Sequence, residues 1–169
     1  LSVEAMGDIV EFSNITWAPD GETVAFSGLR NGNSDLYTYQ LSSKELTQLT
    51  HDVYSDFQPS YSRDGKYIVF STDRLALQGD NRSVDIPMNL AIIEVATLAI
   101  KNIDVFPGAN NLNPLFSSNG EELYFLSNGD GFRNMFRYNL SSGTVVKMTD
   151  YFTGISGITE FSPAMSISG

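Results

Sequence analysis

The one histidine of this chain, His51, is the only imidazole that a hydrolase site could use, and the sequence has no cysteine. A serine hydrolase pairs a histidine with a nucleophilic serine, but the Gly-x-Ser-x-Gly turn that presents such a serine does not occur. A zinc site needs several histidine or cysteine ligands. His51 follows Thr50 at the end of an apolar stretch, so we expect a solvated loop residue. The sequence therefore predicts no catalytic residue, no cofactor-binding residue and no metal ligand.

Oxygen-bearing side chains stand directly before a glycine at three related places, Asp20, Asp64 and Asn119. In a tight turn such a side chain accepts hydrogen bonds from its own backbone. The alternative is a calcium ion held by oxygen ligands, with the Asn-Gly-Asp-Gly segment 128–131 as its best location, although EF-hand spacing is absent. We interpret the three side chains as turn residues, predict no cofactor, and keep calcium as the one ion to consider.

Charged residues gather in one insertion, residues 74–87, which contains Arg74, Asp80, Arg82 and Asp85. Long loops on a rigid scaffold often carry recognition, so these four side chains form a candidate interaction loop. The alternative is plain variation in loop length.

Composition indicates a folded domain, because 41% of the 169 residues are apolar and 12% are aromatic. A formal charge of -10 repels phosphates, so we expect neither nucleic acid nor an anionic membrane surface as a partner. No apolar run approaches the roughly 20 residues that span a bilayer, so we expect no direct membrane insertion. The sequence begins with Leu1, and no basic-then-apolar segment opens it, so we expect either a processed product or an excerpt of something longer; the repeats favour an excerpt.

A tight turn organises the chain and must position all of these side chains. It is first seen in residues 15–21, Ile-Thr-Trp-Ala-Pro-Asp-Gly, where Pro, Asp and Gly each favour a turn. The pattern returns at 59–65, 114–120 and 163–169, with Gly-to-Gly spacings of 44, 55 and 49 residues. A repeated hairpin is therefore the main signal of this sequence.

Strands are expected after each turn. In the first repeat they cover 23–27, 35–41 and 46–50, separated by a polar loop at 28–34 and a turn at 42–45. The last two strands recur at 134–149 and at 89–104 in the same apolar frame. Each repeat is thus a four-stranded antiparallel meander, and the second repeat carries ten extra residues within 74–87.

Four strands per repeat of about 44 residues are typical of a β-propeller blade. The segments that carry a family resemblance are Trp17-Ala18-Pro19-Asp20-Gly21, Val24-Ala25-Phe26-Ser27, Asp35-Leu36-Tyr37 and Leu46-Thr47-Gln48-Leu49-Thr50. They resemble the TolB-like, WD-like propeller repeat, which reads approximately Trp-Ser-Pro-Asp-Gly, Ile-Ala-Phe, Asp-Ile-Tyr and Gln-Leu-Thr. The sequence departs from this pattern at Arg63 and Ser118, which replace proline, and at Asn119 and Ser168, which replace aspartate.

The expected fold is all-β: three full blades of a partial propeller and parts of two more. We assign residues 1–12 to the end of a preceding blade, 13–50, 57–104 and 112–149 to full blades, and 158–169 to the start of a further blade. Because closed propellers have four to eight blades, an open stack leaves an apolar face bare at each end. We therefore expect the remaining blades, or another copy of the chain, as partners.

The resemblance implies a non-catalytic segment that binds a protein partner or supports neighbouring domains in a TolB-like protein. Such proteins are periplasmic, outer-membrane-associated or secreted. The alternative is the propeller portion of a larger enzyme, either a prolyl-oligopeptidase-type serine peptidase or a surface protein with a metallopeptidase domain, whose catalytic residues lie outside this chain. A polysaccharide-cleaving enzyme on the same propeller would need metal or basic groups that we cannot place here.

Overall fold

The structure is a computed structural model that describes residues 7–78, 86–157, 159, 162 and 164–167. The repeated turn occurs once in every sheet of this structure. Gly21, Gly65 and Gly120 have φ angles of 68°, 72° and 73°, a left-handed conformation that glycine adopts without strain. The N–H of each donates to the carbonyl three residues earlier, at 2.9 to 3.1 Å. The three described copies of the motif are therefore the same turn.

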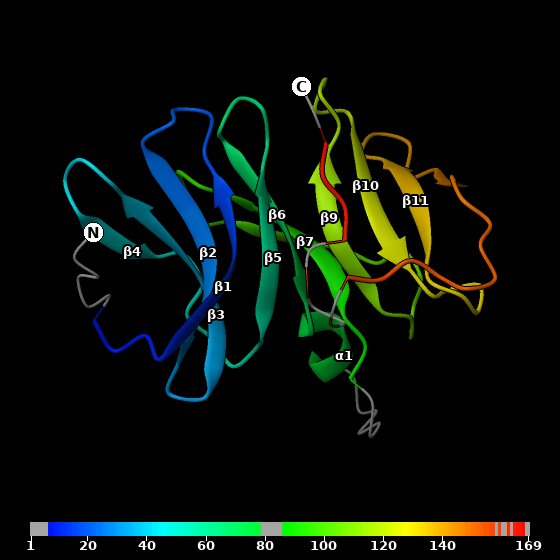
Figure 1. The fold of residues 1–169 in the computed structure, drawn as a ribbon, viewed down its shortest axis with the longest axis horizontal. Helices are drawn as coiled ribbons and strands as arrows, with labels where there is room; N and C mark the ends of the chain where they lie inside the picture. The colour runs from blue at the N-terminus through cyan, green and yellow to red at the C-terminus, as the bar shows by residue number, and fades with distance from the viewer. Residues whose placement is uncertain (1–6, 79–85, 158, 160–161, 163, 168–169) are drawn as a thin grey trace.

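Each turn joins the first two strands of a four-stranded antiparallel sheet, or blade. The first blade consists of β1 (Glu11–Trp17), β2 (Thr23–Arg30), β3 (Asn33–Gln40) and β4 (Glu45–Gln48). The second consists of β5 (Asp56–Tyr61), β6 (Tyr67–Thr72), β7 (Asn89–Glu94) and β8 (Ile100–Ile103). The third consists of β9 (Asn111–Phe116), β10 (Glu122–Ser127), β11 (Asn134–Asn139) and β12 (Val145–Lys147). The predicted all-β fold of propeller blades is confirmed, and Figure 1 shows the three blades side by side.

The first strand of every blade carries the same irregularity, where its pairing with the second strand shifts register. Asn14, Gln58 and Asn113 occupy the shift with φ angles of 53° to 56°, and Pro follows in the second and third blades. Gln58 Oε1 accepts a hydrogen bond from the backbone N–H of Asn113 at 2.8 Å. Asn113 Oδ1 in turn accepts from the N–H of Ala164 at 3.2 Å. Each of these two amides thus connects its blade to the chain that follows.

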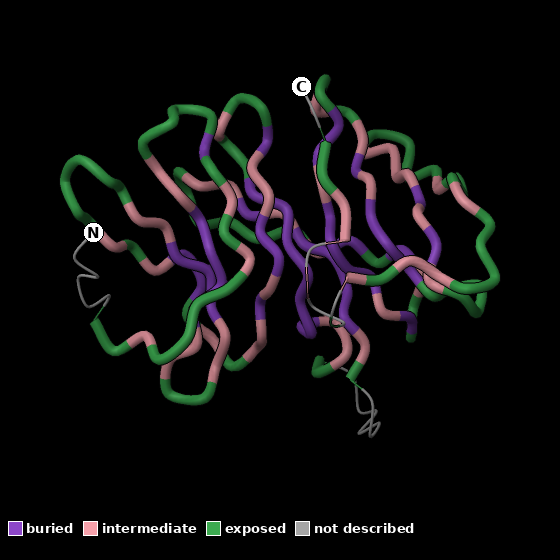
Figure 2. The backbone as a smooth tube through the Cα atoms, in the orientation of Figure 1, coloured by how far each residue is buried: buried purple, intermediate pink, exposed green. Residues whose placement is uncertain are grey.

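The core lies between the blades rather than inside any one of them. One cluster joins the first and second blades through Ala25, Leu36, Leu49, Ile68, Phe70, Ala91 and Ile93. The other joins the second and third blades through Val69, Leu90, Ile103, Val105, Phe116, Leu123, Phe125 and Phe136. Successive residues of β6 point to opposite faces, so the middle blade is covered on both sides. Figure 2 shows this buried backbone along the facing strands, with exposed loops around it.

The apolar face of the first blade that points away from the second is less completely covered. Phe12 and Trp17 are 51% and 58% exposed, and Phe12 packs edge-on against the buried ring of Phe26. The turn alignment matches Trp17 to Tyr61 and Phe116, which pack against the blade before their own. Trp17 therefore faces the position of a preceding blade.

The structure corrects the sequence-based boundaries at the start of the first blade. Glu11 and Phe12 were assigned to a preceding blade, but they belong to β1, where they pair with Leu29 and Gly28. The described residues 7–10 form no strand, and residues 1–6 lie outside the described part.

The expected polar loop at 28–34 is also wrong. β2 continues to Arg30, which pairs with Asn33 across a two-residue turn. The turn residues Asn31 and Gly32 have φ angles of 53° and 87°, the left-handed pair that tight hairpins favour.

The insertion of the second blade lies between β6 and β7, as expected, and begins with a single helical turn, α1 (Arg74–Gln78). In the part of the chain that the structure describes, no helix has the length and apolarity to cross a membrane. At the other end of the chain, the described residues 164–167 form no strand, although Figure 1 shows this segment passing beside β9.

The interblade core supplies the first prediction. Phe125 is fully buried and stacks on Phe136 at a ring-centroid distance of 5.8 Å, so Phe125→Ala should lower the free energy of unfolding by about 3–5 kcal/mol. Phe152→Ala is the matched control, because that ring is 78% exposed and its loss should cost less than about 0.5 kcal/mol. Urea unfolding measures both values. Equal effects of the two substitutions would contradict the assignment of the core.

Candidate functional site

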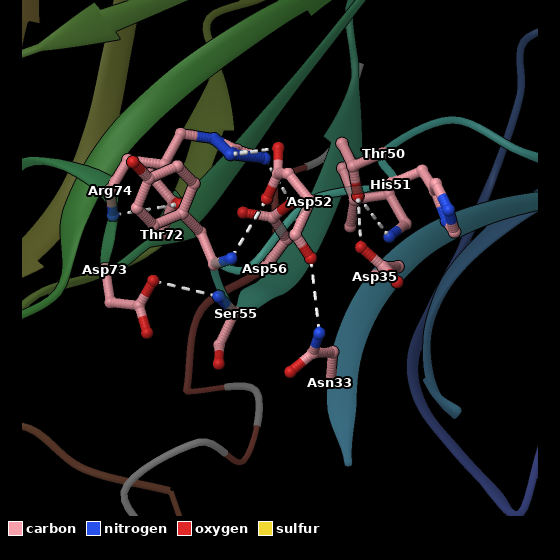
Figure 3. A network of polar contacts seen from close by, with 12 residues as sticks. Asn33, Asp35, Thr50, His51, Asp52, Ser55, Asp56, Thr72, Asp73 and Arg74 are labelled. Atoms are coloured by element: carbon pink, nitrogen blue, oxygen red, sulfur yellow. Dashed lines mark hydrogen bonds and ion pairs between the residues drawn. The ribbon is translucent and has the colours of Figure 1, made fainter. Parts of the chain in front are cut away.

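A network of buried and half-buried polar side chains lies where the first two blades meet (Figure 3). Asp35 starts this network on β3, and residues 50–52 follow β4. Asp56 begins β5, while Asp73 and Arg74 follow β6 (Figure 3). Strand ends of two sheets therefore bring together side chains that are far apart in sequence.

Arg74 is the centre of this network, and its side chain is only 4% exposed. Its Nη1 lies 2.7 Å from Asp52 Oδ2 and its Nη2 lies 2.6 Å from Asp56 Oδ2. The guanidinium carbon also lies 5.1 Å from the ring centre of Tyr54 and 5.8 Å from that of Phe70. Two carboxylates and two aromatic rings thus hold one buried cation.

Asp56 is the carboxylate that the fold isolates most from water, with 0% exposure. Burial raises its pKa to about 7, although the positive charge of Arg74 opposes the shift. Its second oxygen, Oδ1, is buried without a hydrogen-bond partner among the described residues. Asp56 therefore takes up a proton more readily than an exposed aspartate.

Asp35 occupies the neighbouring half of the network. Its Oδ1 accepts from Thr50 Oγ1 at 3.3 Å and its Oδ2 from Gln48 Nε2 at 3.0 Å, and burial raises its pKa. Gln48 Nε2 also lies 3.1 Å from His51 Nδ1. His51 is exposed, as the sequence predicted, and no hydrogen bond joins its ring to a serine within the described residues.

The third blade repeats the Asp35 arrangement with an uncharged residue. Thr149 Oγ1 donates to Asn134 Oδ1 at 3.0 Å and accepts from the N–H of Met135 at the same distance. Thr50 Oγ1 likewise accepts from the N–H of Leu36, at 2.9 Å. The amide of Asn134 accepts the same hydrogen bond from a threonine as the carboxylate of Asp35 does. The Asp35–Thr50 pair therefore positions strand ends, and this role needs no ionisable group.

The charge pair of the network is also part of the repeat. Arg30 and Asp8 of the first blade are separated by the same 22 residues as Arg74 and Asp52, and their ion pair measures 2.9 Å. The Arg30–Asp8 pair lies in water, however, with side chains that are 39% and 78% exposed. Asp52 and Asp56 were not predicted from the sequence as partners of Arg74. The spacing of 22 residues, shared with Arg30 and Asp8, could have indicated the ion pair between Arg74 and Asp52.

The structure does not place Arg74 in an exposed interaction loop, as the sequence had suggested. Its side chain is buried against Asp52 and Asp56, so it cannot contact a partner while these ion pairs persist. The other three residues of that loop, Asp80, Arg82 and Asp85, lie outside the described residues.

The oxygens of the repeated turns do what the sequence predicted. Asp20 Oδ1 accepts from the N–H groups of Glu22 and Thr23 at 2.8 and 2.9 Å, and these bonds lower its pKa. Asp64 and Asn119 accept from the N–H two residues later, each at 3.1 Å. All three are backbone-bonding turn residues.

Among the described residues, one group of carboxylates is close enough to consider a cation, and it is not the segment 128–131 that the sequence suggested for calcium. Asp35, Asp52 and Asp56 each offer an oxygen within 4.8 Å of the others, but the guanidinium of Arg74 already pairs with two of them. In the segment 128–131, Asp130 pairs with Lys147 at 2.6 Å and Asn128 Oδ1 accepts from a backbone N–H. Calcium binding at 128–131 stays a prediction.

Comparisons with known proteins agree with this blade structure, although no family model matches the sequence. The Tol-Pal system protein TolB of Ruthia magnifica is 51% identical over 37 residues, or 22% of this chain and 9% of that protein. The TolB of Francisella tularensis is 29% identical over 90 residues, or 53% of this chain and 19% of that protein. The chain therefore spans no more than a fifth of the length of these two relatives.

Solved structures extend the likeness to most of the chain. TolB from Acinetobacter baumannii superposes with a TM-score of 0.71 at 19% identity, covering 86% of this chain and 34% of that one. A puromycin-hydrolysing peptidase of Mycobacterium tuberculosis superposes with a TM-score of 0.68 at 10% identity, covering 95% and 24%. The three sheets of this chain are blades of a β-propeller, and the propeller fold of the chain is TolB-like.

Loss of Arg74 should be strongly destabilising. Arg74→Ala leaves Asp56 buried without its counter-charge, and we expect a loss of about 3–5 kcal/mol in the free energy of unfolding at pH 8. Arg30→Ala removes the corresponding exposed ion pair and should cost about 1 kcal/mol or less. Urea unfolding of both variants makes the comparison. Similar losses would show that burial of the Arg74 pair has no energetic consequence.

Asp56 should also give stability a pH dependence. The folded protein holds the Asp56 proton up to about pH 7, whereas the unfolded chain releases it near pH 4. Between these values the folded state binds more protons, so this group lowers stability as pH rises, by at most about 1.4 kcal/mol per pH unit. Asp56→Asn removes this contribution, and the difference in unfolding free energy, variant minus wild type, should rise from pH 5 to pH 7.

Asp64→Asn is the control for this titration, because hydrogen bonds from Ser62 and the N–H of Lys66 lower the pKa of exposed Asp64. The pH dependence that Asp64 gives to stability lies below the tested range of pH 5 to pH 7. The unfolding free energy of Asp64→Asn, plotted against pH, should therefore run parallel to that of the wild type. An Asp56→Asn curve that is also parallel would contradict the raised pKa.

Proposed function

We propose that this chain is a non-catalytic segment of a β-propeller that acts as a protein-interaction or scaffolding module of a larger TolB-like protein. The observation that carries the proposal is the incompletely covered apolar face of the first blade, where Phe12 and Trp17 are about half exposed. A sheet face of this kind needs another protein surface to exclude water from it. The remaining blades of the propeller, or a second copy of the chain, are the partners that fit.

The polar network supports the same proposal. Its charges are paired with one another inside the junction of two blades, and its Asp35–Thr50 part is repeated with Asn134 and Thr149. These groups position strands rather than face a substrate. We propose the periplasm, the outer membrane surface or the extracellular medium as the location, on the basis of the TolB likeness alone.

A second candidate is the propeller portion of a larger peptidase. The superposition on the puromycin-hydrolysing peptidase, which covers 95% of this chain, favours it. In that case the catalytic residues lie in a different part of the parent protein. The open reading frame on both sides separates the two candidates, since a hydrolase domain carries Gly-x-Ser-x-Gly or a metallopeptidase motif.

The single tryptophan provides a direct test of the open face. Purified chain should form concentration-dependent oligomers in light scattering, and the Trp17 emission should shift to shorter wavelength as they form, because association removes the indole from water. Trp17→Ser should weaken association in light scattering. Val53→Ser, which removes a 72% exposed side chain from a loop, is the control and should leave association unchanged.

A compact monomer with a cooperative melt and an exposed Trp17 at all concentrations would contradict the need for a partner. Cleavage of fluorogenic peptides by the purified chain would contradict its non-catalytic nature.

A further inference from the structure

An open groove of about 660 Å³ lies between the second and third blades, on the side of the repeated turns. Tyr67 and Ile92 contribute apolar surface from the second blade, and Phe116 and Leu140 contribute it from the third. Arg63, next to the second-blade turn, and Lys101 on β8 also line it. Its size and its mixture of apolar and polar groups are typical of a ligand-binding site.

The turn beside the groove has an arginine where the turn of the first blade has a proline. In the first blade the motif has Pro19, whose Cδ atom would lie 3.5 Å from a Cβ atom on Gly65 of the next blade. The equivalent residue of the second blade is Arg63, and a Cβ atom on Gly120 of the third blade would meet nothing within 4 Å. The proline that brings the first two turns into contact is thus replaced by a cation, and the space stays open.

The charges of the groove favour an anionic group in the ligand. Arg63 and Lys101 are exposed, and neither side chain forms an ion pair or a hydrogen bond with another described residue. Of the two carboxylates of the groove, Asp64 lies 3.5 Å from the ammonium group of Lys66, whereas that of Glu94, within the described part of the chain, accepts only from the hydroxyl of Thr97 and keeps its charge. Two uncommitted cations therefore border an apolar surface in a chain with a formal charge of -10.

We infer that this groove binds a short peptide segment of a partner protein, in which a carboxylate side chain stands beside apolar side chains. The apolar side chains cover Ile92 and Phe116, while the carboxylate lies between Arg63 and Lys101. This inference rests on the proposed protein-binding function, and it adds a site remote from the open face around Trp17. Because charge attraction in an exposed groove is screened by salt, peptide affinity falls as ionic strength rises.

Selection from a random heptapeptide library displayed on phage tests the inference with the full 169-residue chain. Enriched peptides should contain aspartate or glutamate next to leucine, isoleucine or an aromatic residue. Fluorescence anisotropy with the best peptide should then show at least a tenfold loss of affinity for the Arg63→Gln/Lys101→Gln variant. Arg30→Gln/Lys44→Gln removes the same charge from the first blade and should bind as the wild type does.

Arg63→Pro removes one of the two cations and keeps the turn, because Pro19 occupies the same position in the first blade. This variant should melt at the wild-type temperature or above it and should lose peptide binding. No acidic, apolar consensus, or a consensus peptide that binds all variants equally, would overturn the inference. Selection of basic peptides would also overturn it. Association through Trp17 is measured on a different face, so failure of the groove leaves that test of the proposed function intact.

Discussion

Burial of both faces of a sheet is the constraint on which this structure depends. Successive residues of β6 send Ile68 and Phe70 to one neighbour and Val69 to the other. Within the described residues only the middle blade has neighbours on both sides. Stability is therefore a property of the junctions between blades, and a blade at the end of the stack keeps apolar surface in water.

Polar groups make these junctions specific. The first junction contains a buried arginine with two aspartates, and hydrogen-bonded side chains hold the ends of the strands. A buried ion pair contributes little net stability, yet it costs much energy to separate. These ion pairs hold the start of the second blade, and the hydrogen bond from Asn33 Nδ2 to the carbonyl of Asp52 at 3.2 Å links them to the first blade. The groove between the second and third blades is the opposite case, a junction that its turn residues leave partly open.

Local chemistry made the blades predictable, because the turns depend on neighbouring residues alone. The prediction of a loop at 28–34 was wrong because Gly28 suggested the end of a strand. In the structure this glycine makes room for a ring, since a Cβ atom there would lie 2.8 Å from the ring of Tyr37. This glycine permits close packing within a strand. The buried network was missed because Arg74 and Asp56 meet only after two strands pair, and burial, which raises the pKa of Asp56, has no local signature.

The amides at the register shifts give the stack a direction. Gln58 accepts from the third blade and Asn113 from the segment after it, so in both cases the acceptor precedes its donor along the chain. A ribosome therefore makes each acceptor before the backbone that will bond to it. A blade thus presents a hydrogen-bond acceptor to the segment that follows it, and both bonds run in the same direction along the stack.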